Sequence, residues 1–233
     1  ENPMTAQERR AVASLALLYS FRMIGLFMVL PLRALYAADM PGATPALIGL
    51  ALGGYGLTQA LLQIPLGWLS DQVGRKQVII GGLLMLVAGS VVAGMADTVY
   101  GIIIGRAMQG AGAIAGTVMA LGADLTGEEQ RTKAMALVGI SIGLAFAVAI
   151  VLGPLVAAAG GLSGVFWFTA LLAVIGIGVV LVLVPTPERV GIEHSDVGAR
   201  RGLILRSLRE PALARLNFGV FTLHFTLMAC FLV

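Results

Sequence analysis

The sequence predicts an all-α polytopic membrane protein, and three observations lead to this fold class. Of the 233 residues, 58% are hydrophobic and only 12% are charged, whereas a soluble domain carries about 25% charged residues. The mean hydropathy is +0.96, which excludes a disordered chain, because disorder needs low hydrophobicity and high charge. Apolar stretches of about 20 residues, the length that crosses a bilayer as a helix, recur along the chain.

Six of these stretches are expected to form membrane-spanning helices. Glycine and proline inside them are tolerated, because neighbouring helices satisfy the freed backbone groups. A seventh stretch begins near Leu213 and continues to Val233. The six expected spans are Val12–Leu32, Ala46–Leu69, Val78–Ala96, Thr98–Gly122, Ala134–Ala158 and Ser163–Val184.

The polar segment that follows the sixth span divides the chain. It carries charges of both signs and prolines at its edges. We therefore expect a six-helix bundle over residues 1–184, a cytoplasmic linker over residues 185–212 and the start of a second bundle over residues 213–233. An ordinary cytoplasmic loop is an equally good interpretation of the linker. Because the chain starts at Glu1 and ends within or just after the seventh helix, we expect it to be part of a longer protein.

Lysine and arginine residues outside the spans predict the orientation. Twelve of them lie on the side of the N-terminus, and Arg33 alone lies on the other side. The positive-inside rule then places the N-terminus in the cytoplasm. This asymmetry accounts for the sequence pI of about 9.4, so nucleic acid is not an expected partner. With a single cysteine and no Cys/His spacing typical of a zinc site, we expect no metal and no cofactor.

The short connection between spans two and three, residues 67–76 (GWLSDQVGRK), is the most informative segment. Gly74 suits a tight turn between antiparallel helices, and Gly67 allows another helix to approach closely. Asp71 and Arg75 bring opposite charges to the membrane edge, where a pair interacts more strongly than in bulk water. A positive-inside hairpin with a turn glycine is the simpler interpretation.

Two further segments place unusual residues inside spans. In span four, Arg106, Gln109 and Gly110 are spaced so that they share one helix face. An arginine within the membrane is costly and usually faces a cavity or a partner. In span five, Gly153 and Pro154 belong to a row of small residues that permits close helix packing.

These segments resemble signature motifs of the Major Facilitator Superfamily: the loop G-x-L-x-D-x-x-G-R-K, the pattern R-x-x-Q-G-x-G, and the antiporter signature centred on Gly-Pro. Gln72 departs from the loop motif, which commonly has a basic residue there, and Ala149 replaces a glycine of the antiporter signature. The whole chain resembles the N-terminal half of the drug:proton antiporter branch, and within it the YajR-like bacterial inner-membrane transporters.

The resemblance implies twelve helices in two six-helix bundles that work by alternating access. The weak likeness of span one to span four, each with an arginine inside it (Arg22 and Arg106), leads us to expect that the first bundle is a 3+3 inverted repeat. It also implies that the loop acid lies near a helix of the other half and that the loop arginine pairs with an acid at the end of span four. We call the residues that would hold the cytoplasmic side closed in the outward-facing state the latch. The latch comprises Gly67, Asp71, Gly74, Arg75, Lys76 and Asp124.

Polar residues inside the spans are expected to line a central cavity, because they are costly against lipid. Hydrogen bonding between helices is an equal alternative for the glutamines. The candidates in spans one, two and four are Tyr19, Arg22, Tyr55, Gln59, Gln63, Arg106 and Gln109. The six spans carry no acid well inside them, so a proton would need an acid elsewhere or His224 in the seventh stretch. A packing role is the alternative for this histidine.

The expected function is secondary active transport, with proton-coupled export of small amphipathic compounds. Proton-coupled import of a polar metabolite is the near alternative, and a non-transporting receptor or scaffold on the same fold is another. We see no catalytic constellation, so an enzyme is not expected. The expected partners are a small-molecule substrate, a proton and the lipid bilayer, and the expected location is the bacterial inner membrane, as a monomer.

Overall fold

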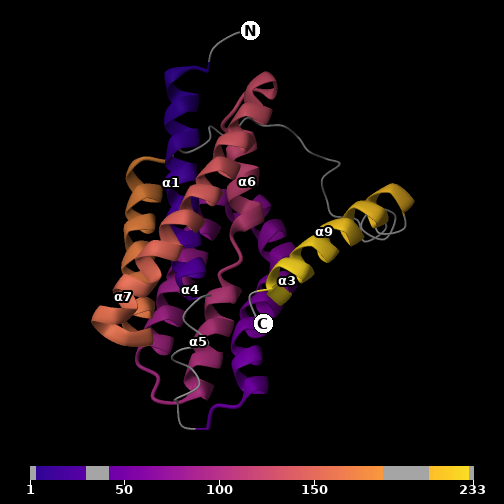
Figure 1. Ribbon diagram of the computed structural model, residues 1–233. Helices are drawn as coiled ribbons and strands as arrows, with labels where there is room; N and C mark the ends of the chain where they lie inside the picture. Colours follow the sequence, from indigo (N-terminus) through magenta and orange to yellow (C-terminus); the bar gives the residue numbers. More distant parts are fainter. Residues whose placement is uncertain (1–3, 30–41, 186–209, 231–233) are drawn as a thin grey trace. The chain divides into compact units, whose positions relative to one another are not determined.

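The computed structural model describes residues 4–29, 42–185 and 210–230 of the chain. It divides into two units, residues 1–187 and 188–233. The described parts of both units are helical (Figure 1). The helices are α1 (Ala6–Val29), α3 (Pro45–Val73), α4 (Arg75–Gly94), α5 (Val99–Ala111), α6 (Ala115–Asp124), the 3-10 turn η1 (Glu128–Gln130), α7 (Arg131–Val182) and α9 (Pro211–Cys230).

Five helical stretches of the described residues are long and apolar enough to cross a membrane. Four of them overlap the first four predicted spans, and the fifth, Glu128–Val182, contains the fifth predicted span and nearly all of the sixth. Within it α7 turns at Gly161, where φ is 64° and ψ is −162°, a conformation that L residues with a side chain avoid. The two arms, residues 131–160 and 162–182, are about 45 Å and about 32 Å long, and Figure 1 shows them folded back on each other.

The fourth predicted span differs from expectation, because it is divided into two helices. α5 ends at Ala111 and α6 begins at Ala115, and Gly112 between them has φ −75° and ψ 45°. The backbone N–H of Ile114 donates to the carbonyl of Gly112 at 2.8 Å instead of continuing the helical pattern. The span is therefore two helices separated by a break, not one continuous helix.

The core of the first unit forms where α7 packs against α1 and α4. Gly153 lies in the contact between α7 and α1, where an added Cβ would lie 3.2 Å from the Met28 carbonyl oxygen. Ala145, Ala149 and Ala157, on the same row, are buried. Small residues are needed here because the two backbones approach closely. Pro154 follows inside the helix, within α7.

The predicted linker lies almost wholly outside the described residues, so its boundaries remain a prediction. α9 begins at Pro211, two residues before the start expected for the seventh stretch. His224 belongs to α9, but its side chain lies outside the described part of the structure.

Candidate functional site

The first candidate feature is the turn between α3 and α4, which a single residue makes. α3 ends at Val73 and α4 begins at Arg75. Gly74 between them has φ 118° and ψ 138°, which only glycine adopts without strain. Its N–H donates to the Ser70 carbonyl at 3.2 Å and closes the end of α3. The turn therefore brings the last residues of α3 beside the first residues of α4.

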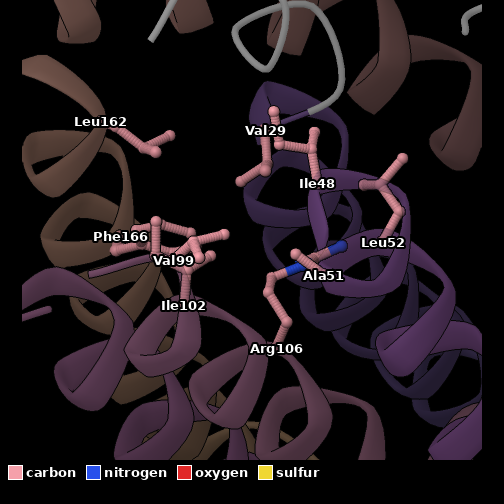
Figure 2. Close-up of a pocket in the computed structure, with 9 residues that line it drawn as sticks. All are labelled: Val29, Ile48, Ala51, Leu52, Val99, Ile102, Arg106, Leu162 and Phe166. Atoms are coloured by element: carbon pink, nitrogen blue, oxygen red, sulfur yellow. The ribbon is translucent and has the colours of Figure 1, made fainter. Parts of the chain in front are cut away.

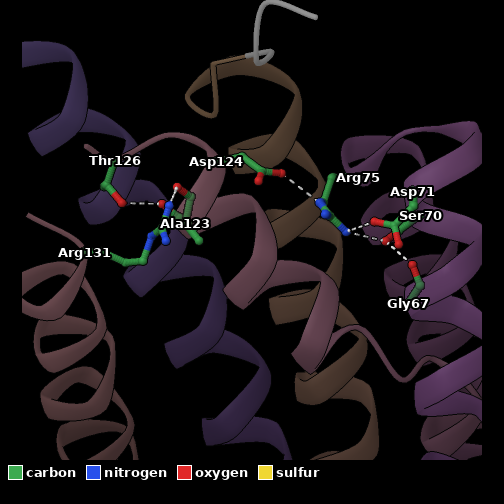
Figure 3. A network of polar contacts seen from close by, with 9 residues as sticks. Gly67, Ser70, Asp71, Arg75, Ala123, Asp124, Thr126 and Arg131 are labelled. Carbon is green, nitrogen blue, oxygen red and sulfur yellow. Dashed lines mark hydrogen bonds and ion pairs between the residues drawn. The ribbon is translucent and has the colours of Figure 1, made fainter. Parts of the chain in front are cut away.

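Arg75 uses this turn to join three helices, as Figure 3 shows. Its Nη1 lies 2.6 Å from Oδ1 of Asp71 at the end of α3. Its Nε lies 2.8 Å from Oδ2 of Asp124, the last residue of α6. The Arg75 side chain is 22% exposed, and the two carboxylates are 44% and 43% exposed. Partly exposed ion pairs stabilise by about 1 kcal/mol or less each, so the arrangement is specific in geometry yet readily broken.

Ser70 completes this arrangement, and sequence reasoning did not single it out. Its hydroxyl donates to the Gly67 carbonyl at 2.6 Å and accepts from Nη1 of Arg75 at 2.9 Å. Ser70 is buried. Its place one residue before Asp71 in the motif was the available signal. We call Ser70, Asp71, Arg75 and Asp124 the Arg75 network.

Gly67 has no close neighbour in the first unit, so the close helix approach expected of it remains a prediction. An added Cβ at Gly67 would meet no atom within 4 Å. Its carbonyl accepts a hydrogen bond from the Ser70 hydroxyl. Ile64 and Trp68, which are near it on α3, are exposed.

Further hydrogen bonds join the ends of α1, α4 and α7 and the turn after α6 at one end of the first unit. Lys76 donates to the carbonyl of Val184 at 3.0 Å, beyond the end of α7. Arg10 on α1 donates to the carbonyl of Val182 at 3.2 Å. Glu8 accepts from the N–H of Gly127, in the turn after α6, at 2.8 Å. Arg10, Arg75 and Lys76, which were predicted to share one side of the membrane, therefore lie at one end of the first unit; which side that end faces remains a prediction.

The second candidate feature is a pair of buried guanidinium groups. Arg22 on α1 and Arg106 on α5 are each 3% exposed. Arg22 donates to the Gly112 carbonyl at 2.5 Å and to the Tyr55 hydroxyl at 3.3 Å. The guanidinium of Arg106 lies 4.6 Å from the centre of the Tyr55 ring, which is a cation–π contact. Tyr55 thus contacts both cations, one with its hydroxyl and one with its ring.

A buried hydrogen-bond chain fixes Arg106 from the other side. Its Nη1 donates to Oε1 of Gln109 at 2.8 Å, and Nε2 of Gln109 donates to the Ser90 hydroxyl at 2.8 Å. The Ser90 hydroxyl donates to the Leu86 carbonyl on α4 at 2.7 Å. Ser90 was also missed by the sequence analysis, because a single serine in an apolar span gives no distinguishing pattern.

Neither arginine of this pair has a carboxylate partner among the residues that the structure describes, where the ion pairs found are those of Arg75. The Nε atoms of Arg22 and Arg106 are buried and have no hydrogen-bond partner. A buried charge costs several kcal/mol unless it is paired or well hydrogen-bonded. The two arginines therefore create a strongly positive region inside the helices of the first unit.

Arg106 also borders an apolar pocket, shown in Figure 2. Residues of α1, α3, α5 and α7 line this pocket, and among the described lining residues only Arg106 is charged. The apolar residues are Val29, Ile48, Ala51, Leu52, Val99, Ile102, Leu162 and Phe166. One cation at the edge of an apolar surface is a suitable contact for a group that combines negative charge with a hydrocarbon part.

The remaining predicted cavity residues are less closely gathered. Gln59 and Gln63 are half-buried on α3, and the Oε1 atom of each lacks a hydrogen-bond partner. Tyr19 lies in the apolar core with Leu83 and Ile114. Gly110 packs against the backbone of Tyr55 and the side chain of Thr58. Within the described ranges no three His, Cys, Asp or Glu residues are grouped as a metal site would need.

A model of the Major Facilitator Superfamily matches residues 15–233 of the chain. The chain belongs to this superfamily. It is 50% identical to the inner membrane transport protein YajR of Escherichia coli, over 98% of the chain and 50% of that protein. It is 27% identical to a multidrug resistance protein B homolog of Mycobacterium tuberculosis, over 79% of the chain and 33% of that protein. The chain spans about half the length of the curated relatives it matches.

Solved structures show the same fold. The crystal structure of the human organic anion transporter MFSD10 superposes with a TM-score of 0.67 at 21% sequence identity, covering 78% of this chain and 49% of that chain. At this identity the likeness concerns the fold alone. The chain is therefore a multi-pass helical membrane protein of a superfamily of transporters, not of enzymes, which confirms the predicted family and fold class.

Proposed function

We propose that the protein is a secondary active transporter that works by alternating access and couples proton movement to the export of small amphipathic compounds. Membership of the Major Facilitator Superfamily supports transport, and the names of the relatives in Mycobacterium tuberculosis support export of drug-like compounds. We further propose that it acts as a monomer in a bacterial inner membrane with its N-terminus in the cytoplasm, in line with the name of its Escherichia coli relative.

The observation that carries the proposal is the Arg75 network. One guanidinium ties the end of α3 to the end of α6 through two carboxylates. Alternating access needs contacts that hold one state and can be exchanged for others. A partly exposed network, worth about 1 kcal/mol or less per pair, has the strength for such a role. We propose that it forms the latch of one end of the transporter.

Exposed apolar faces on α3 and α7 are evidence in favour of a second helix bundle. Leucine and other large apolar side chains on α3 recur every three or four residues and are exposed, and the first arm of α7 carries a similar row. Such rows form continuous stripes on a helix. We propose that they contact lipid and the second bundle. The rows are Leu57, Leu61, Ile64 and Trp68 on α3, and Ile140, Leu144, Val148, Val151 and Leu155 on α7.

The buried arginines favour the proposal that the substrate carries a negative or polar group. Arg22 and Arg106 have no carboxylate partner in the described part of the chain, and Arg106 borders the apolar pocket. A positive potential in a low-dielectric region attracts anionic groups. The human organic anion transporter MFSD10 shares the fold. The coupling proton would be carried by an acid outside the described spans or by His224.

The proposal is tested by reconstituting the intact protein in vesicles and imposing a proton gradient across the membrane. Uptake or release of fluorescent amphipathic compounds, with and without a carboxylate, is measured for the wild type and for Arg75→Ala. We expect gradient-driven flux that Arg75→Ala reduces several-fold. Arg9→Ala, which removes an exposed arginine at the same end of the bundle, is the matched control and should keep the flux.

The alternatives give different results in the same assay. Accumulation of polar metabolites together with protons would indicate an importer. A protein that binds compounds but moves none of them under any gradient would indicate a receptor or scaffold and would overturn the proposal.

A further inference from the structure

The break in the fourth span is completed by a side chain from the first. In a continuous α-helix the Gly112 carbonyl would accept from the N–H four residues later. Here it accepts from the N–H of Ile114 at 2.8 Å and from Nη1 of Arg22 at 2.5 Å. Arg22 is separated from Gly112 by 90 residues of sequence. The joint between α5 and α6 is therefore held by a tertiary contact, not only by local backbone preference.

Electrostatics explain why an arginine suits this place. The end of a helix leaves carbonyl groups without intrahelical partners and carries a partial negative charge. Inside a membrane no water is at hand to satisfy such carbonyls. Arg22, 3% exposed, lies at the end of α5 and has no carboxylate partner among the described residues. The carbonyl groups at the break provide a negative potential that stabilises the Arg22 cation. Arg22 in turn provides the hydrogen-bond donor for the Gly112 carbonyl.

The second half of the broken span ends in the Arg75 network. α6 has ten residues and is about 15 Å long. It begins just after the break and ends at Asp124, which binds Arg75. A change of angle at the break therefore displaces the Asp124 carboxylate relative to Arg75.

The first half of the span is anchored independently. The Thr58 hydroxyl of α3 lies 2.9 Å from the Ala107 carbonyl of α5 and 2.9 Å from the Gly54 carbonyl of its own helix, so its one proton is shared between these acceptors. Gly110 packs directly against Tyr55 and Thr58 of α3, with no room for a side chain. α5 is thus packed on α3 more extensively than α6 is, so we expect movement at the break to displace mainly α6.

We propose that Arg22 is a positioning residue: its bond to the Gly112 carbonyl holds the break in span four and thereby holds Asp124 against Arg75. Anything that draws Arg22 away from Gly112 then loosens the Arg75 network through α6. The part of this inference that concerns transport rests on the proposed function. The geometric part concerns the chain itself and is measured without substrate or gradient.

The experiment measures distances between spin labels in the intact protein, purified in a cysteine-free background. One pair joins exposed positions on either side of the break, Tyr100→Cys on α5 and Glu128→Cys after α6. The second pair, Leu69→Cys and Glu128→Cys, reports how far the end of α6 lies from the end of α3. Arg22→Ala is compared with Arg22→Lys, which keeps a cationic donor.

Arg106→Ala is the matched control, because it removes an equally buried guanidinium of the same cluster that does not bond to the break. We expect Arg22→Ala to change the modal distance of both pairs by more than about 3 Å, two helical residue rises, whereas Arg22→Lys and Arg106→Ala keep the wild-type distances. If Arg22→Ala does not yield a monodisperse protein, Arg22→Gln, whose shorter neutral side chain does not reach Gly112, carries the same expectation.

Unchanged distances in Arg22→Ala, or an equal change in Arg106→Ala, would overturn the inference and leave Arg22 a packing residue. Because no flux is measured, the distances keep their meaning if the protein proves to be no transporter.

Discussion

The Asp124–Arg75 ion pair offers a quantitative test of the latch. Asp124→Asn keeps the shape of the side chain and removes the charge that lies 2.8 Å from Nε of Arg75. Because the carboxylate is 43% exposed and the guanidinium 22%, the pair is screened by water, and we expect about 0.5–1 kcal/mol from it. This free energy corresponds to a shift of about two- to fivefold in the equilibrium between latched and unlatched states.

The shift in the equilibrium between latched and unlatched states can be measured as the rate at which one introduced cysteine reacts with a thiol reagent. Gln59→Cys, at a predicted cavity position on α3, is exposed to a membrane-impermeant thiol reagent from the latch side in an otherwise cysteine-free protein. We expect labelling to become about two- to fivefold faster in Asp124→Asn. Arg75→Gln removes this pair and also the pair with Asp71, so it should give at least as large an increase. The double variant should give little more than Arg75→Gln alone, because Arg75→Gln already removes the Asp124 interaction.

Additivity would refute this reasoning. If the effects of Asp124→Asn and Arg75→Gln simply multiply, the two side chains are not coupled in the state that controls access, whatever their distance in the structure. Glu129→Gln, an exposed acid in the same turn region, is the matched control and should leave the labelling rate unchanged.

Two glycine positions give further predictions. Gly74→Ala places a side chain at φ 118°, so we expect a loss of more than about 1 kcal/mol of stability and a lower thermal midpoint in detergent, whereas Gly56→Ala, with open space around it, keeps the midpoint. Gly110→Ala forces a methyl group against the Tyr55 carbonyl and should cost about 1–3 kcal/mol. Gly139→Ala meets no atom within 4 Å and serves as its control; equal midpoints for these two variants would contradict the close packing at Gly110.

Much of the fold was predictable because membrane helices follow composition over short windows. Apolar runs of about 20 residues locate the spans, and the loop GWLSDQVGRK indicates both a tight turn and the superfamily. The pairing of Arg75 with an acid at the end of span four was expected from the family resemblance alone, and the structure places Asp124 within 2.8 Å of it.

The partners within the buried cluster were not predictable from local pattern. Tyr19 and Arg22 lie one turn apart in span one, yet Tyr19 joins the apolar core and Arg22 reaches the Gly112 carbonyl. Ser70 and Ser90 became visible as hydrogen-bond partners only when Arg75 and Gln109 were placed beside them. Ser70 at least precedes the acid of the loop motif, whereas no signal within its own span distinguishes Ser90 from other serines.

The order of apolar and charged residues along the chain by itself determined that this protein is a bundle of membrane helices with a charged turn at residues 67–76, because burial in lipid is decided locally by about 20 residues at a time. Only the tertiary structure decided that span four is broken at Gly112 and that Arg22 fills the break. A carbonyl freed inside the membrane must find a donor, and that donor comes from a helix 90 residues away.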